Sequence, residues 1–128
     1  MPLNGCDLSL YFNHVFQIVP VDSGHFKVRS EGYAYRVDRP SESGTPEEVI
    51  SYHWHPHLLG GPEFPHMHVH ASGRDKHLAR VHFPTGRMSI ERLVLFLIRE
   101  YGAMPTVAGG ESLVRENLQR LENAWRWF

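Results

Sequence analysis

Two short stretches of the sequence alternate histidine with apolar or aromatic residues. The first reads Tyr52-His53-Trp54-His55, and the second reads His66-Met67-His68-Val69-His70. Because successive side chains of a β-strand point to opposite faces of a sheet, this spacing predicts two strands that each turn one face to a core and a row of histidines to the other side. If the strands pair antiparallel, the histidines of both lie on one surface, with cross-strand Cβ atoms ~5 Å apart.

Residues 1–86 read mainly as strands separated by turns. Val, Ile, Tyr and Phe recur in short runs with partial alternation, and Gly, Pro, Asp and Ser cluster between the runs. The expected strands are Leu8–Val19, His25–Arg29 with Gly32–Val37 as one interrupted strand or two, Val49–His55, His66–Ala71 and His77–Phe83.

Residues 89–125 change to the helical period of about 3.6 residues. Ser89 is a suitable N-cap, and Gly102 stands where a left-handed C-terminal residue is expected. The apolar stripe between them is Ile90, Leu93, Val94, Leu97, Ile98 and Tyr101. A second helix is expected over Glu111–Trp125, and its apolar side would be Leu113, Val114, Leu118, Leu121 and Trp125.

Strands followed by helices predict an α+β fold. We expect a single domain over residues 1–128, with strands mainly in 1–86 and two helices in 89–125. Its architecture would be an antiparallel sheet of about five strands followed by two C-terminal helices packed on one face.

Length, charge and cysteine content limit the class of protein. A chain of 128 residues fits one domain, and its net charge of −1 provides no overall field that would attract nucleic acid or membrane. The longest nearly apolar run, Leu93–Ile98, is far too short to span a bilayer, and the N-terminus has no secretory pattern. A single cysteine, Cys6, excludes an intramolecular disulfide and suits a reducing compartment. We therefore expect a cytoplasmic protein that does not contact a membrane.

Histidine is unusually frequent in this chain. Ten of the 128 residues are histidine, and most of them lie between His53 and His82. The stretch from His66 to Arg92 also carries five Lys or Arg residues against two acidic ones, so a nearly neutral protein could present a local basic surface. Any chemistry of the protein is therefore expected in this region.

Metal-free acid–base chemistry on a phosphodiester is the leading interpretation. Histidine takes up and releases protons near neutral pH, and cleavage of RNA by its own 2′-hydroxyl needs a base, an acid and a cation. The assigned catalytic residues are His66 and His68 as acid and base, His53 and His55 across the strand pair, and Arg80 or Arg87 beside the phosphate. The assigned substrate-binding residues are Tyr35, Tyr52 and Trp54 for stacking bases, and Arg74 and Lys76 for holding phosphates. Whether the protein is an enzyme stays open; as an enzyme it would be an endoribonuclease that needs no cofactor.

A transition-metal site is the alternative interpretation. Neutral imidazoles on adjacent strands are ligands for Zn, Fe, Ni or Cu. Glu63 is the nearest carboxylate in the sequence that could complete such a site. The candidate ligands are His53, His55, His66 and His68.

A non-enzymatic interaction module is the third interpretation. Its histidine face would be only a polar, solvated side of the sheet. The apolar C-terminal segment Trp125–Phe128 would either complete the core or form a contact in a homodimer. Core packing is favoured, because aromatic residues commonly complete a core.

Two segments resemble a known family. Ile50-Ser51-Tyr52-His53-Trp54-His55-Pro56-His57 and Phe64-Pro65-His66-Met67-His68-Val69 resemble the TumE-like toxin family, small bacterial proteins encoded beside an antitoxin and proposed to act as ribonucleases. Ser51 and His53-Trp54 stand where the family has Arg and Asp-Asn. The resemblance covers Ile50–Val69 and implies a toxin ribonuclease whose partners are RNA and a cognate antitoxin. The alternation in His66–His70 is also similar to that of histidine-triad nucleotide hydrolases, although a Gly-Pro loop replaces the helix that precedes their motif.

Overall fold

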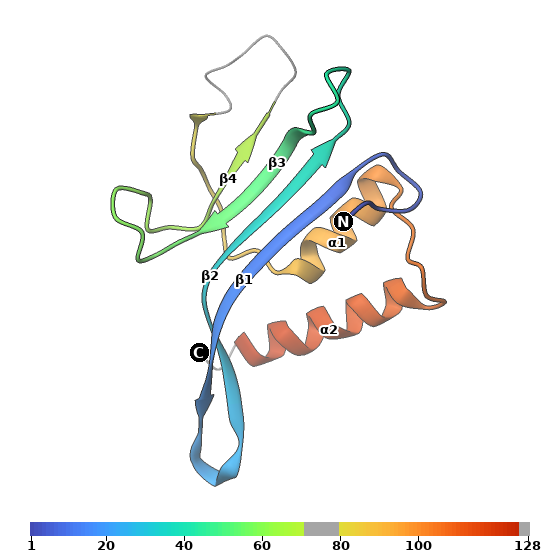
Figure 1. The fold of residues 1–128 in the computed structure, drawn as a ribbon. Coiled ribbons are helices and arrows are strands. Elements are labelled where there is room, and N and C mark those ends of the chain that lie inside the picture. The colour runs from blue at the N-terminus through green and yellow to red at the C-terminus, as the bar shows by residue number, and fades with distance from the viewer. Residues whose placement is uncertain (71–79, 126–128) are drawn as a thin grey trace.

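A five-stranded antiparallel sheet and two helices make up residues 1–70 and 80–125, the part of the chain that the computed structural model describes (Figure 1). The strands are β1 (Ser9–Pro20), β2 (Phe26–Arg39), β3 (Glu47–Trp54), β4 (His66–Val69) and β5 (Phe83–Pro84), and each pairs with the next. The helices are α1 (Ile90–Tyr101) and α2 (Gly110–Trp125). This architecture confirms the α+β fold expected from the sequence.

The strands β1 and β2 form a long hairpin, and the expected interruption of β2 is a bulge. The register shifts between Val15 and Phe16, where Glu31 is the extra residue on β2. A Cβ atom at the neighbouring Gly32 would lie 2.8 Å from the carbonyl oxygen of Trp54, which explains the glycine at this position. One strand therefore spans both of the expected segments.

The far edge of the sheet is short in the described residues. β4 pairs with β3 over four residues, and β5 pairs with β4 only at Phe83 and Pro84. Of the strand expected over His77–Phe83, residues 77–79 lie outside the described part of the chain, as does Ala71 at the end of the preceding one. The pairing of Phe83 with Met67 nevertheless turns Phe83 toward the core side of the sheet.

The core lies between one face of the sheet and α1. Its buried residues are Leu8, Leu10, Tyr33, Tyr35, Val37, Tyr52, Trp54, Leu93 and Leu97. The ends of α1 are those expected from the sequence: the hydroxyl of Ser89 accepts a hydrogen bond from the N–H of Arg92 (3.2 Å), and Gly102 adopts a φ of 72°. α1 is thus held in place at both ends as well as by its apolar stripe.

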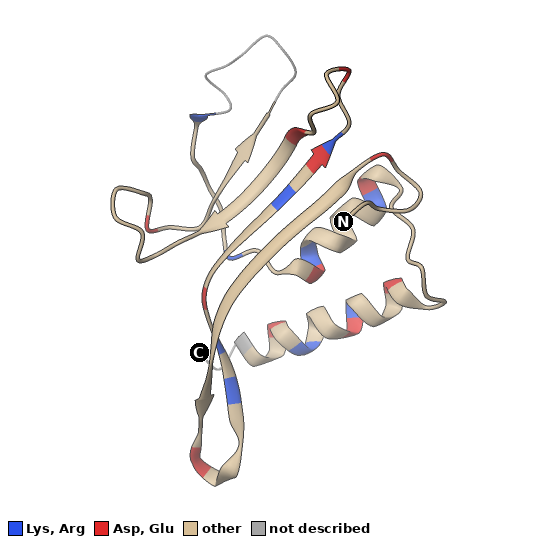
Figure 2. Ribbon diagram, in the orientation of Figure 1, with Lys and Arg blue, Asp and Glu red and all other residues tan. Residues whose placement is uncertain are grey.

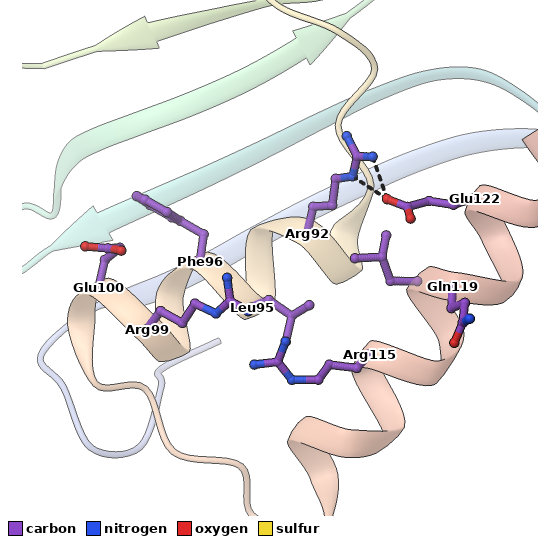
Figure 3. Close-up of a pocket in the computed structure, with 9 residues that line it drawn as sticks. Arg92, Leu95, Phe96, Arg99, Glu100, Arg115, Gln119 and Glu122 are labelled. Carbon is purple, nitrogen blue, oxygen red and sulfur yellow. Dashed lines mark hydrogen bonds and ion pairs between the residues drawn. The ribbon is translucent and has the colours of Figure 1, made fainter.

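α2 packs against α1 through a partly polar contact (Figure 3). Arg92 of α1 donates two hydrogen bonds to Glu122 of α2, at 3.2 and 2.6 Å, and Leu95 is buried between the helices. Leu113, expected on the apolar side of α2, is 56% exposed, and no α2 side chain described from 110 to 124 is buried. Packing of the helices on one face of the sheet is therefore tight for α1 and only partial for α2.

Two further expectations concern the C-terminal segment and the possibility of a membrane-spanning helix. The side chain of Trp125 and residues 126–128 lie outside the described part, so their packing stays a prediction. Neither described helix combines the length and the apolar character needed to cross a bilayer.

Candidate metal centre

The register of β3 and β4 brings the two rows of histidines onto one surface. His53 pairs directly with His66, and Ser51 pairs with His68. The rings of His53 and His66 stack at 5.7 Å between centroids, and the ring of His53 meets that of His68 edge-on at 5.6 Å. The ring of His55 also lies 5.6 Å from that of His53, so the structure brings together all four histidines that the sequence assigned to this face.

His82 joins this cluster from a segment that is distant in sequence. Its ring lies 4.9 Å from that of His66 and 4.7 Å from that of His68, centroid to centroid. One ring nitrogen from each of these three residues lies within 4.8 Å of the other two. We call His66, His68 and His82 the histidine trio.

His82 was not among the site residues assigned from the sequence, although it ends the histidine-rich stretch in which the site was expected. Its neighbour Phe83 pairs with Met67 and points to the core side, so His82 points to the histidine side. The available signal was the dipeptide His82-Phe83, which repeats the alternation of histidine and apolar residue found in β3 and β4. The sequence could not show that this dipeptide pairs with β4.

The buried member of the trio has a defined orientation. His66 is 5% exposed, and its Nδ1 lies 3.0 Å from the carbonyl oxygen of Phe64. Because a carbonyl oxygen only accepts hydrogen bonds, Nδ1 carries the proton and Nε2 keeps a free lone pair. A backbone carbonyl in this role is the usual second-layer partner of a histidine that binds a metal through its other nitrogen.

The cluster favours neutral imidazoles. Burial and, to a smaller extent, the adjacent His68, His55, His66 and His82 together lower the pKa of His53 to about 4. Burial also lowers the pKa of His66, partly offset by its hydrogen bond to Phe64. Crowded imidazoles repel one another when charged, so near neutral pH these two rings are unprotonated and can offer lone pairs to a proton or a metal.

Two other histidines of these strands have different partners. Nδ1 of His53 and Nε2 of His55 lie 3.4 Å apart, so His55 borders the cluster but is not one of the trio. His70 forms an ion pair with Glu48, and Glu48 also accepts a hydrogen bond from the hydroxyl of Ser51 at 3.2 Å. The carboxylate of Glu48 therefore contacts His70, which is not one of the trio.

The aromatic residues expected to stack bases lie on the wrong side of the sheet. Tyr35 is 1% exposed, and Tyr52 and Trp54 are also buried in the core that α1 covers. Period-two alternation itself puts them opposite the histidines, because Tyr52 and Trp54 flank His53. This corrects their assignment as substrate-binding residues.

The expected cations are dispersed. The guanidinium of Arg87 lies 4.1 Å from the centre of the ring of Trp54, on the core side and away from the histidine trio, which corrects its assignment to the catalytic group. Arg80 is exposed and stands two residues before His82 in the chain. Arg74 and Lys76 lie outside the described residues, so their role in holding phosphate stays a prediction. Glu63 is exposed and is not part of the group formed with the trio.

Comparisons with known proteins do not identify a family or a function for this chain. No family model, no curated protein and no solved structure matches the chain. The resemblance of Ile50–Val69 to the TumE-like toxins therefore stays a prediction from the sequence.

Proposed function

We propose that this protein binds one transition-metal ion through His66, His68 and His82, with zinc as the first candidate. The observation that carries the proposal is the convergence of three ring nitrogens, each within 4.8 Å of the others. Around a tetrahedral zinc ion, nitrogen ligands lie about 3.3 Å apart. Side-chain rotations that move each ring nitrogen by about 1 Å would bring the trio to that spacing.

The protonation state of His66 supports metal binding. A metal competes with protons for imidazole lone pairs, so a site whose rings are already neutral binds an ion at little cost in proton release. The lowered pKa of His66, and its Nδ1 hydrogen bond to Phe64, leave Nε2 free for an ion.

Three imidazole ligands leave one coordination position for a water molecule or a substrate. Sites of this composition activate water as a nucleophile when zinc is bound. His53, in ring contact with both His66 and His68, lies where it could accept a proton from such a water or supply the fourth ligand. We therefore infer a hydrolytic metalloenzyme of the cytoplasm; the location rests on the single cysteine.

Metal-independent cleavage of RNA is the second candidate. It is favoured by the ring contacts of His53 with His66 and His68, which put candidates for an acid and a base side by side. In this candidate the exposed Arg80 would be the cation beside the phosphate. The aromatic residues expected to stack bases are buried in the core and Arg87 lies over Trp54, so none of them takes part. A toxin role, with RNA and an antitoxin as partners, belongs to this second candidate, and an interaction module without chemistry is the third.

The decisive measurement is metal content by mass spectrometry on untagged protein, followed by zinc titration of the chelated protein. We expect about one equivalent of metal in the wild type and its loss in His82→Ala and His68→Ala. His82 is exposed, so its replacement tests the site without opening a cavity. The matched control is His57→Gln, an exposed histidine beside Arg87 on the core side of the sheet, which should keep the metal.

Each other outcome points to a different candidate. Absence of metal in the wild type, together with RNA cleavage in EDTA that is lost in His68→Ala, would replace the metal proposal with the ribonuclease. Absence of both would leave the interaction module. Metal that persists in His82→Ala would refute the trio as the ligand set.

A further inference from the structure

In the described part of the chain, no strand pairs with the outer edge of β1 beyond its beginning. Residues 1–3 cover only its beginning: Leu10 donates a hydrogen bond to the carbonyl of Met1 (2.8 Å) and accepts one from the Met1 amino group (3.0 Å). Beyond Leu10, no described strand lies on this side of β1, and every residue from 11 to 18 is exposed. The edge strand of a sheet with free N–H and C=O groups is a template for pairing with another strand.

This edge has few of the features that keep edge strands apart, and the bulge opposite Val15 and Phe16 lies on β2, with β1 itself continuous. Monomeric proteins protect long edge strands with charged residues, prolines or bulges. Residues 8–21 contain no Lys, Arg, Asp or Glu, and β1 is free of charged residues along its whole ribbon (Figure 2). Its first proline within the strand is Pro20, at the far end. The exposed apolar residues of the strand are Tyr11, Phe12, Val15, Phe16 and Ile18.

We propose that β1 pairs antiparallel with β1 of a second copy of this chain, about a two-fold axis that passes beside Val15. The backbone groups of Leu10 point outward, since they bond to Met1, and alternation then turns those of Phe12, His14, Phe16 and Ile18 outward as well. A pairing centred on Val15 uses the open residues 12–18 and stops short of the covered segment around Leu10.

The side chains are complementary in this register. On the helix-facing side, Phe12 would lie opposite Ile18 of the second copy, and His14 opposite Phe16. On the other side, Asn13 would lie opposite Gln17, and Val15 opposite Val15 of the second copy. The two amides, Asn13 and Gln17, meet each other, Phe12 meets Ile18 and Val15 meets Val15, so the pair of His14 with Phe16 is the one mixed pair. A shift of the pairing by two residues in one direction instead places Asn13 opposite Val15, and the same shift in the other direction places Val15 opposite Gln17.

The paired surface is modest in size. Seven residues of strand span about 24 Å. The half-exposed aromatic and aliphatic side chains would bury about 400 Å² per copy, and the backbone ladder adds to this, against roughly 800 Å² in a standard interface. We therefore expect a dimer whose dissociation is observed on dilution.

The first test compares molecular mass in solution for the wild type, Val15→Lys and Val28→Lys, by light scattering or sedimentation in EDTA, which removes any metal bridge. We expect a dimer for the wild type and a monomer for Val15→Lys, because the axis puts two lysines face to face. Val28 on β2 is the matched control: it is 62% exposed, against 51% for Val15, and lies off the edge, so Val28→Lys should stay dimeric. A mixture of Val15→Lys and Val15→Glu should form a mixed dimer again.

The second test measures the register. With Cys6→Ser as background, Val15→Cys should form a disulfide-linked dimer on mild oxidation, because non-hydrogen-bonded antiparallel partners have Cα atoms about 4.5 Å apart. Val28→Cys should stay unlinked. A wild type that is monomeric at every concentration overturns the proposal, whether the edge is left free or is occupied by residues 126–128 or by another protein. A dimer that survives Val15→Lys assigns dimerisation to a different surface.

Discussion

At the scale of the residue, three buried tyrosines show how the core responds to pH. Burial raises the pKa of Tyr35, with Tyr33 and Glu91 adding to the effect. Burial also raises the pKa of Tyr52, and that of Tyr33 despite the hydrogen bond that its hydroxyl accepts from the N–H of Met88 (2.8 Å). All three are therefore neutral in the folded protein over a wider pH range than in the unfolded chain.

We expect the free energy of unfolding to fall as the pH rises above about 10. A raised folded-state pKa contributes stability that is complete below the unfolded pKa and is lost as the pH rises from that value through the folded pKa. Tyr35→Phe should retain more of its neutral-pH stability at high pH than the wild type does. Urea unfolding at neutral and alkaline pH measures this, and Tyr11→Phe, at an exposed position, is the control. Equal alkaline losses in wild type and Tyr35→Phe would contradict the assignment.

The histidines illustrate what can be read from single residues. Placing His53, His66 and His68 on one surface required only alternation along each strand and antiparallel pairing. His82 could not be assigned in this way, because its place depends on a pairing between segments far apart in the chain. Tyr52 and Trp54 are suited to stacking by residue type, but their alternation with His53 places them on the opposite face, in the core.

At the scale of the element, α1 is the part of the fold that the sequence defines best. Ser89 caps its first turn, and Leu93 and Leu97 bury its inner face against the sheet. Both signals are local, since the cap lies within three residues of its partner and the stripe follows the helical period.

Ser89→Ala should lower the free energy of unfolding by about 1 kcal/mol. The mutation leaves the N–H of Arg92 without the hydroxyl that accepts its hydrogen bond. Ser89→Asp should restore most of the loss, because aspartate also caps helices and its charge favours a helix N-terminus. Chemical unfolding measures the effect, with Ser112→Ala, at an exposed position in α2, as the control. A neutral Ser89→Ala would show that the cap contributes nothing.

Which face a strand residue points to depends on the register with the neighbouring strand, whereas the inner face of α1 follows from its own sequence. A slip of one residue between β3 and β4 would turn His66 and His68 toward the core and Met67 toward solvent. Burial of Tyr52, Trp54 and Met67 on one face therefore fixes the register, and the register in turn assembles the histidine cluster on the other face.

At the scale of the whole molecule, one face of the sheet forms the core and the other carries the histidines. α1 covers one face and forms the core with it (Figure 1). The cluster lies on the opposite face, so changes at His68 or His82 leave the apolar core intact. The helices also leave residues 11–18 of β1 exposed, which is the basis of the proposed dimer.

Zinc should raise the stability of the whole fold. An ion that binds only the native state adds about 2.7 kcal/mol at a free concentration one hundred times its dissociation constant. We expect the midpoint of thermal unfolding to rise with zinc and to return with chelator in the wild type and in His57→Gln. The same addition should leave His82→Ala nearly unchanged, and an equal rise in that variant would indicate zinc binding elsewhere.

The sequence by itself determined those features that arise within one element: the strand and helix periods, the ends of α1, the order of strands and helices, and the side of each strand on which its histidines lie. These follow from backbone geometry, which repeats every few residues. The tertiary structure alone decided that His82 completes a trio with His66 and His68, that Arg87 lies over Trp54, and that no strand of the described residues covers the outer edge of β1 beyond Leu10. Each of these depends on which distant segments pack together, and packing is settled by the burial of the core as a whole.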